Sequence, residues 1–403
     1  MISSGDASDI AQRATSNSRR IMIVAGEASG DIYGADLVQK ALSLDANINF
    51  FGIGGSRMRE AGVTTLVDSG EMAVMGLIEV LKHFNVISSA FLKLKNILQH
   101  DPPDLLLLID YPGFNIRLAK VARKAGVKVL YYISPKVWAW KAGRIRKIAA
   151  TVDQMAVIFP FEVPLYEKEG VPVSFVGHPM LDLVNVTMER DEAAASFGLD
   201  PANKIVGLFP GSRRSEIERI LPAILGSAKL LQKRYPGVQF VLPLASTLHE
   251  SDIQPYLEQA GITPVITRTR IHDLIRACDA IISVSGTVTL EIALIGTPMV
   301  IIYRLASLTY QVAKRVVKIK HIGLCNIVAG ETVVRELIQD QANPEEIAAE
   351  IERLLSDHSY RDTMTGKLGE MRAQLGCGGA AENVARLALG LCGQSANLTG
   401  LPQ

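Results

Sequence analysis

The chain has 403 residues, of which 48% are hydrophobic and 21% charged, as in globular α/β proteins with a large core. Its 42 basic and 41 acidic side chains leave a net charge of +1, so no global positive field recruits nucleic acid. This length favours two domains, and no apolar run reaches the roughly 18 residues that would span a bilayer. The four cysteines lack CxxC spacing, which argues against a zinc site and a disulfide framework.

Residues 1–19 are polar and mixed in charge, so we expect a disordered N-terminal leader. From Arg20 onward, short β-branched runs alternate with longer helical patterns, which predicts parallel sheets covered by helices. The first predicted strands are Ile21–Ala25, Ile48–Gly52, Thr65–Val67, Asp104–Asp110, Lys128–Ile133, Gln154–Ile158 and Ser174–Val176. The second series is Ile205–Phe209, Gln239–Leu244, Pro264–Thr267, Ala280–Val284 and Met299–Tyr303.

We therefore expect an α/β protein with two doubly wound, Rossmann-like domains at 20–185 and 186–355, followed by C-terminal helices and a tail at 356–403. Ligands of such sheets gather outside the carboxyl ends of the strands. The loops that follow the strands of both domains should accordingly face one cleft.

The first such loop, Ala25–Asp31, is rich in small residues and carries the carboxylates of Glu27 and Asp31. Its glycines do not follow the GxGxxG spacing, which argues against a dinucleotide cofactor. The loop suits close approach of a ligand to the backbone. Alternatively, Ser29 and Asp31 only cap the following helix.

The segment Met72–Leu98 contains more large apolar residues than a surface helix needs, and they lie on more than one face. Basic neighbours make an interfacial membrane contact or an acyl-chain groove one interpretation. A well-buried helical hairpin is the other. The candidate contact residues are Met75, Leu77, Ile78, Leu81 and Phe84.

Asp110 stands where a strongly apolar strand stops, just before Pro112 and Gly113. A carboxylate at the carboxyl end of a central strand is well placed to act as general base on a hydroxyl. Capping of the next helix is the alternative, because aspartate is a favoured cap.

Two further candidates follow later strands of the first domain. Trp138 is an aromatic anchor that suits sugar or acyl contact as well as core packing. His178 is a lone histidine, a residue type that more often forms structural hydrogen bonds than catalyses. No HxH, HExxH or DxD motif accompanies it, so we expect neither a metal nor another cofactor.

The stretch Lys204–Glu216 reads as a buried strand, a Pro-Gly-Ser turn and a helix with Ser215 as its expected N-cap. Such a turn presents unpaired N–H groups and a partial positive charge, here at Gly211 and Ser212. The planar guanidinium of Arg213 matches phosphate oxygens. Locally, a plain strand-to-helix turn fits equally well.

A second turn of this kind, Ser285-Gly286-Thr287, follows the strand Ala280–Val284. Its N–H groups should also face an anion. Glu291, about one turn into the next helix, is suited to accept hydrogen bonds from ribose hydroxyls. Two phosphate-type turns in one domain fit a nucleoside diphosphate better than a single phosphate.

Nine ordered motifs between Ile21 and Leu355 make the chain resemble the lipid-A-disaccharide synthases, inverting glycosyltransferases of lipopolysaccharide assembly in Gram-negative bacteria. They are AGEASGD (25–31), GIGG (52–55), MGLIEVL (75–81), IDYPGFN (109–115), YISPKVWAW (132–140), FVGHPM (175–180), PGSRRSE (210–216), SGTVTLE (285–291) and LCNIVAG (324–330).

The resemblance implies a GT-B fold and the condensation of UDP-2,3-diacylglucosamine with 2,3-diacylglucosamine 1-phosphate, which gives a β-1,6-linked disaccharide and UDP. Asp110 then matches the family's essential aspartate and Arg213 its essential arginine, which holds the diphosphate. Glu291 would bind the ribose and Asn326 would lie near the nucleotide. Relatives often carry a second carboxylate at the position of Gly113, and its absence here points to Asp110 as the base.

The resemblance also implies a cytoplasmic protein held peripherally at the inner face of the cytoplasmic membrane, which favours the membrane-contact interpretation of Met72–Leu98. The acceptor would then be met by Glu27, Ser29, Asp31, Trp138 and His178. The C-terminal tail either closes back on the first domain or is exchanged in a homodimer.

Two other functions stay open at this point. A UDP-N-acetylglucosamine 2-epimerase shares the paired domains and the nucleotide seat, but it needs no acyl groove. A non-catalytic nucleotide-sugar or lipid-binding protein would tolerate the loss of the Asp110 carboxylate.

Overall fold

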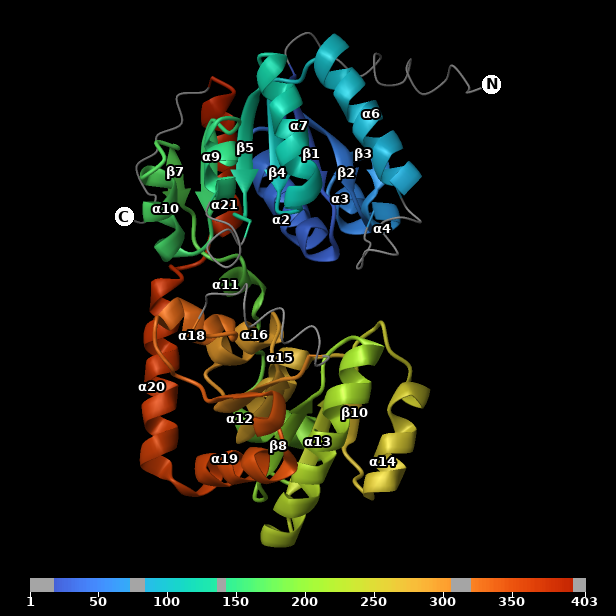
Figure 1. Cartoon of the computed structure of the whole chain (residues 1–403), viewed down its shortest axis with the longest axis vertical. Helices are drawn as coiled ribbons and strands as arrows, with labels where there is room; N and C mark the ends of the chain where they lie inside the picture. Colours follow the sequence, from blue (N-terminus) through green and yellow to red (C-terminus); the bar gives the residue numbers. More distant parts are fainter. Residues whose placement is uncertain (1–17, 73–83, 136–142, 306–319, 394–403) are drawn as a thin grey trace. The chain divides into compact units, whose positions relative to one another are not determined.

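The computed structural model describes residues 18–72, 84–135, 143–305 and 320–393 (Figure 1). The chain forms two compact units. Unit 1 comprises the residues up to Pro179 together with those from Cys377 onward, and unit 2 comprises Met180–Gly376. Each unit is described by itself below.

Within its described residues, unit 1 contains a seven-stranded parallel sheet in the order β3-β2-β1-β4-β5-β6-β7. The strands are β1 (Arg19–Ala25), β2 (Ile48–Gly54), β3 (Thr64–Asp68), β4 (Leu105–Ile109), β5 (Lys128–Tyr132), β6 (Gln154–Val157) and β7 (Val173–Phe175). The helices are α2 (Ala28–Leu44), α3 (Ser56–Glu60), α4 (Ser69–Met72), α6 (Phe84–His100), α7 (Pro112–Lys124), α9 (Gly143–Ala149), η1 (Pro160–Glu162), α10 (Val163–Glu167) and α21 (Ala380–Leu391).

Both faces of the unit 1 sheet are buried, which explains the unbroken apolar sequence of β4. Leu106 and Leu108 belong to a core cluster that includes residues of α6, α7 and α9. Their neighbours Leu105 and Leu107 are also fully buried, and they point to the opposite face because successive side chains of a strand alternate. The sheet is therefore enclosed by helices, as the predicted doubly wound fold requires.

The C-terminal helix α21 belongs to unit 1, although the residues that precede it in the sequence form unit 2. It packs against α2. The Asn383 side-chain amide donates to the Val176 carbonyl oxygen at 3.0 Å, and Lys128 Nζ donates to the Leu391 carbonyl oxygen at 2.8 Å. The chain thus enters unit 2 once and returns to complete the first core.

The described part of unit 2 contains a six-stranded parallel sheet in the order β10-β9-β8-β11-β12-β13. The strands are β8 (Ile205–Phe209), β9 (Gln239–Pro243), β10 (Val265–Thr267), β11 (Ala280–Val284), β12 (Met299–Tyr303) and β13 (Glu336–Ile338). The helices are α11 (Met180–Leu183), α12 (Arg190–Ser196), α13 (Arg214–Arg234), η2 (Glu250–Asp252), α14 (Gln254–Ala260), α15 (Ile271–Ala277), α16 (Val288–Ile295), α18 (Leu324–Ala329), η3 (Gln339–Gln341), α19 (Pro344–Ser356) and α20 (His358–Gln374).

All twelve predicted strands are confirmed, and the two doubly wound sheets confirm the expected fold class. The strand that the sequence did not reveal is β13, which has three residues and begins with Glu336. So short and charged a segment carries no apolar alternation. It is recognisable only from its parallel pairing with β12 at the edge of the sheet.

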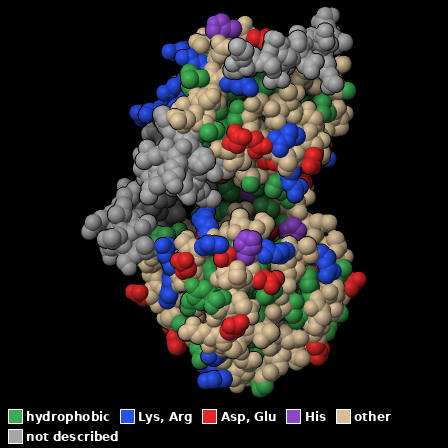
Figure 2. Space-filling model, turned by 90° about the vertical axis from the view of Figure 1, so that its right-hand side faces the viewer, with side chains coloured by type: hydrophobic (Ala, Val, Ile, Leu, Met, Phe, Trp, Pro, Cys, Tyr) green, Lys and Arg blue, Asp and Glu red, His purple; other side chains and the backbone are tan. Residues whose placement is uncertain are grey.

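On the face of unit 2 that Figure 2 shows, basic and acidic side chains are interspersed. Among the helices that the structure describes, none has the length and apolar character needed to cross a membrane.

Candidate functional site

The two phosphate-type turns lie side by side at the carboxyl edge of the unit 2 sheet. They follow β8 and β11, which are neighbours with Phe209 paired to Ser283. Gly211 has a φ of +104°, and a Cβ at this position would lie 3.1 Å from Cγ1 of Val284 and would collide with the Glu216 carboxylate. Glycine is therefore required where the first turn touches the end of β11.

The first turn is organised around Glu216. One carboxylate oxygen of Glu216 accepts hydrogen bonds from the backbone N–H groups of Ser212 at 3.0 Å and Arg213 at 3.2 Å. The other accepts from the Arg213 guanidinium at 3.2 Å. This corrects the expectation that the turn's N–H groups are unpaired. The turn does bind an anion, but this anion is the Glu216 carboxylate of the chain itself.

The same contacts explain why Ser215 is not the N-cap of the following helix. α13 begins at Arg214 and its N-cap is Arg213. Since Glu216 lies three residues after Arg213, its carboxylate reaches back to the N–H groups of Ser212 and Arg213, immediately before the helix. The prediction of Ser215 as N-cap was wrong because the Glu216 carboxylate, and not a serine hydroxyl, is the acceptor at the start of this helix.

The second turn is anchored through its first residue and exposed through the next two. Ser285 donates its N–H to the Ile302 carbonyl at 3.1 Å and its hydroxyl to the Ile322 carbonyl at 3.2 Å. Gly286 and Thr287 are exposed immediately before α16. A Cβ at Gly286 would have open space around it, so the backbone at this helix start is accessible to a ligand.

The Asn326 side chain makes all of its observed hydrogen bonds within unit 2. Its side chain is fully buried; the amide nitrogen donates to the Val334 carbonyl at 2.7 Å and to Glu336 at 2.8 Å, while its oxygen accepts the N–H groups of Val333 and Val334. The amide is therefore committed to the loop before β13. The expectation that Asn326 lies near the nucleotide stays a prediction.

Tyr303 joins the candidate residues of unit 2, although the sequence did not single it out. It ends β12, the strand next to β11. Burial raises the pKa of its hydroxyl, with the nearby Glu216 carboxylate adding to the rise and Arg213 opposing it. These influences place Tyr303 beside the first turn. In the sequence, Tyr303 could have been identified by its position at the end of a predicted strand that follows Ala280–Val284.

In unit 1, Asp110 directly follows the central strand β4, as predicted. Asp110 and Tyr111 both adopt the left-handed region, with φ values of +43° and +46°. The Asp110 N–H donates to the Tyr132 carbonyl at 3.0 Å, and its carbonyl accepts from Asn115 Nδ2 at 2.8 Å and from the Tyr131 hydroxyl at 2.6 Å. Such strained backbone persists only when its surroundings hold it, and it clusters at active sites.

The N-cap position of α7 is held by Tyr111 and not by Asp110. The Tyr111 ring instead packs on the first loop, where a Cβ at Gly26 would lie only 2.6 Å from Cγ of Tyr111. Burial and the nearby Glu27 carboxylate raise the pKa of Tyr111. The loops after β1 and β4 are thus in contact, with Glu27 and Ser29 exposed.

Asp31 does not belong to this exposed set. It is 7% exposed and accepts the backbone N–H groups of Gly55 at 2.6 Å, Arg57 at 3.2 Å and Met58 at 3.2 Å. It therefore caps α3, whereas the sequence suggested either a ligand contact or a cap for its own helix. The side chain joins the loop after β1 to the Gly-Gly turn after β2.

Replacing Asp31 with alanine is expected to lower the free energy of unfolding by about 2 kcal/mol, because it leaves buried N–H groups without an acceptor. Urea denaturation monitored by circular dichroism measures this change. Glu27→Ala, in the same loop but exposed, is the matched control and should change the free energy by less than about 0.5 kcal/mol. Equal stabilities of the two variants would contradict the capping role.

His178 is 4% exposed, with its ring centroid 5.1 Å from that of Phe159. Burial lowers the pKa of the imidazole to about 4. At neutral pH the side chain is therefore uncharged. The expected contact of His178 with the acceptor stays a prediction.

This burial predicts an acid-sensitive stability. Since the folded pKa of His178 is about 4 and the unfolded one about 6.5, the unfolded chain binds more protons between these values. Stability should be complete above pH 6.5 and should fall by about 3 kcal/mol as the pH drops to 4. Unfolding free energies of wild type and His178→Gln across this range test it. The variant should show a shallower fall, exposed His100→Gln should follow wild type, and parallel curves for all three would contradict the prediction.

Several predicted contact residues lie outside the described part of the chain, namely Trp138, Met75, Leu77, Ile78 and Leu81. Phe84 begins α6, but its side chain is not described. On α6 itself Leu94 and Leu98 are fully buried, while Leu92 is 60% exposed. The described helix thus combines core packing with an exposed apolar residue.

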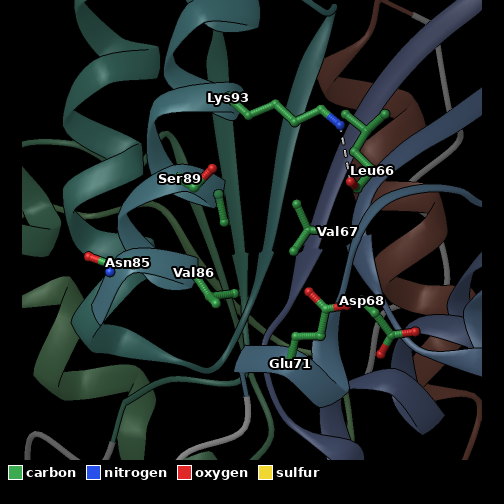
Figure 3. A pocket seen from close by; sticks show the side chains of 9 residues that line it. Leu66, Val67, Asp68, Glu71, Asn85, Val86, Ser89 and Lys93 are labelled. Carbon is green, nitrogen blue, oxygen red and sulfur yellow. Dashed lines mark hydrogen bonds between the residues drawn. The ribbon is translucent and has the colours of Figure 1, made fainter. Parts of the chain in front are cut away.

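A cavity of about 510 Å³ lies between the β3–α4 segment and α6 (Figure 3). Val67 and Val86 line it together with the charged Asp68, Glu71 and Lys93. The Lys93 ammonium group donates to the Leu66 carbonyl at 3.2 Å. A groove built for acyl chains is mostly apolar, so this mixed lining suits polar groups as well.

Among the residues that the structure describes, no group of three or more His, Cys, Asp and Glu side chains is arranged to hold a metal ion.

Comparison with solved structures identifies the fold. A Neisseria meningitidis UDP-GlcNAc 2-epimerase bound to UDP-GlcNAc superposes with a TM-score of 0.61 at 15% identity, covering 92% of this chain and 100% of that one. Acinetobacter baumannii MurG gives 0.57 at 15% identity, covering 92% and 99%. At such identities the likeness concerns the fold alone.

Sequence comparison identifies the family. A family model described as lipid-A-disaccharide synthetase matches residues 21–378. The lipid-A-disaccharide synthase of Trichlorobacter lovleyi is 67% identical over 377 residues, which cover 94% of this chain and 98% of the relative. That of Geobacter metallireducens is 60% identical over 380 residues, covering 94% and 99%. The chain therefore belongs to the lipid-A-disaccharide synthase family.

Proposed function

We propose that this protein condenses UDP-2,3-diacylglucosamine with 2,3-diacylglucosamine 1-phosphate to give the β-1,6-linked disaccharide 1-phosphate and UDP. The observation that carries the proposal is the 67% identity to a lipid-A-disaccharide synthase over 98% of that relative's length. The epimerase alternative is not favoured, since the epimerases resemble this chain at 14–15% identity and in fold only.

The donor diphosphate binds at the paired turns of unit 2. The contact of Gly211 with Val284 supports this assignment, because it brings the two turns together. The diphosphate replaces Glu216 as partner of the Arg213 guanidinium and of the N–H groups of Ser212 and Arg213. The exposed Gly286 and Thr287 supply the second helix start, and Glu291 binds the ribose. Fixed positive groups at the leaving phosphate stabilise the charge that develops there.

Asp110 acts as general base on the acceptor. It takes the proton of the 6-hydroxyl while that oxygen forms a bond to the anomeric carbon and the bond from this carbon to the UDP oxygen breaks. A single in-line displacement inverts the anomeric centre and leaves UDP as the departing anion. The strained backbone of Asp110, held by Asn115 and Tyr131, supports the assignment.

The acceptor's acyl chains and the membrane meet unit 1 around α6. Leu92, 60% exposed beside Lys93, supports a peripheral contact with an anionic membrane surface, because an apolar side chain next to a basic one is typical of interfacial helices. The expected location is the inner face of the cytoplasmic membrane. The membrane-contact role that the sequence analysis gave to Met75, Leu77, Ile78, Leu81 and Phe84 is part of this proposal, although the first four lie outside the described residues.

Incubation of the purified protein with UDP-2,3-diacylglucosamine, with and without the acceptor monophosphate in detergent, tests the function. Disaccharide and UDP should form only when both substrates are present. Epimerised donor without acceptor would indicate an epimerase. Binding of the donor without turnover would indicate a binding protein.

A further inference from the structure

His272 connects the candidate ribose contact of unit 2 to the segment by which the chain enters that unit. It is the second residue of α15. Its Nδ1 lies 3.2 Å from the backbone nitrogen of Asn185, and its Nε2 lies 3.3 Å from a carboxylate oxygen of Glu291 on α16. Both side chains of the His272–Glu291 pair are largely buried, at 23% and 22% exposed.

These two contacts determine which ring nitrogen carries the proton. A backbone N–H only donates, so Nδ1 must accept from Asn185. The proton therefore resides on Nε2 and is donated to the Glu291 carboxylate. A neutral imidazole satisfies both partners, and His272 holds one oxygen of Glu291 as a directional donor.

The neighbouring residue fixes the same entry segment. Asp273 is 3% exposed and accepts the Thr187 N–H at 2.8 Å and the Thr187 hydroxyl at 2.9 Å. Asn185 and Thr187 lie shortly after Met180, where unit 2 begins. The first residues of α15 thus accept hydrogen bonds from this segment, and His272 also contacts Glu291.

We propose that His272 is a positioning residue for nucleotide recognition, which orients the Glu291 carboxylate toward the ribose hydroxyls and links it to the entry segment Asn185–Thr187. The inference rests on the proposed function, since it requires that Glu291 binds the ribose of UDP. With one oxygen of Glu291 held by His272, the other is directed to the hydroxyls. Within the described residues, no second hydrogen bond to Glu291 competes for it.

Two substitutions separate the contacts of His272. In His272→Asn the amide oxygen reaches the position of Nδ1, so the contact with Asn185 is kept and the one with Glu291 is lost. In His272→Gln the amide nitrogen reaches the position of Nε2, so the reverse holds. The two amides are similar in polarity, and each variant serves as the control for the other.

Binding of UDP and of 2′,3′-dideoxy-UDP, measured by isothermal titration calorimetry, gives the readout. Wild type should bind UDP at least about 10-fold more tightly than the dideoxy compound, the size of one hydrogen bond to a charged group. This ratio should fall to about 2 in His272→Asn and stay within about twofold of wild type in His272→Gln. A structural role alone would weaken both ligands equally and leave the ratio unchanged.

The proposal is overturned if His272→Asn keeps the wild-type ratio, or if both variants lose it. A wild-type ratio near 1 in an enzyme that still makes disaccharide would show that Glu291 does not bind the ribose. It would overturn this inference but leave the transferase function intact. Failure of wild type to bind UDP at all would instead contradict the proposed function.

Discussion

Asp110→Asn is expected to lower kcat for disaccharide formation by about 100-fold or more, the usual contribution of a general base. Asparagine has the same shape as aspartate and is one of the few residues that tolerate the left-handed backbone region. The strained backbone at φ +43° and its hydrogen bonds should therefore survive. Initial rates with radiolabelled donor at saturating concentrations of both substrates measure the effect, and urea denaturation should show a stability close to wild type.

Tyr131→Phe is the matched control for this prediction. It removes the hydroxyl that donates to the Asp110 carbonyl at 2.6 Å but leaves the carboxylate in place. The expected result is a loss of about 1 kcal/mol in unfolding free energy with a much smaller loss of kcat than in Asp110→Asn. Wild-type turnover in Asp110→Asn would exclude Asp110 as the base.

The sequence predicted the architecture because the apolar runs of the strands are strong local signals. Leu105–Ile109 reads as a buried strand without any knowledge of its neighbours, and the structure places it at the centre of its sheet. β13 escaped because its identity depends on pairing with β12 and not on its own composition. Likewise, the sequence correctly located the carboxyl ends of strands β4, β8 and β11. Asp110, Arg213 and Ser285 therefore lie just beyond the strand ends where they were expected.

What the sequence did not reveal is where the polar side chains near these edges are directed. Asp31 caps a helix that begins 25 residues later, and Asn326 binds a loop beyond the end of its own helix. Whether such a side chain meets backbone or ligand is decided by tertiary contacts, which leave no local pattern. The left-handed backbone of Asp110 and Tyr111 is equally hidden, since neither residue is glycine. Aspartate tolerates this region better than most residues do, but a tyrosine adopts it only where its surroundings hold it.

Arg213→Ala is expected to lower kcat/KM by about 100- to 1,000-fold, since it removes a fixed positive group from the leaving diphosphate. The Arg213 side chain is 57% exposed and pairs with Glu216 at 3.2 Å, so its guanidinium is accessible to a ligand at the turn. Arg213→Lys should retain only part of the activity, because an ammonium group does not bind two phosphate oxygens with a planar fork. Steady-state rates at varied donor concentration, together with UDP binding by calorimetry, measure both variants.

The adjacent Arg214 provides the control that gives this prediction its meaning. Its side chain is similarly exposed, at 69%, but its guanidinium pairs with Asp252 at 3.1 Å. If positive charge near the turn were all that mattered, the two alanine variants would lose activity equally, and the assignment of Arg213 would fail. The Arg213 guanidinium and the backbone N–H groups of the turn all donate to the Glu216 carboxylate. Arg213 is therefore part of the anion-binding turn itself. Arg214→Ala should therefore stay within about threefold of wild type, as expected for an exposed ion pair, and only Arg213→Ala should weaken UDP binding.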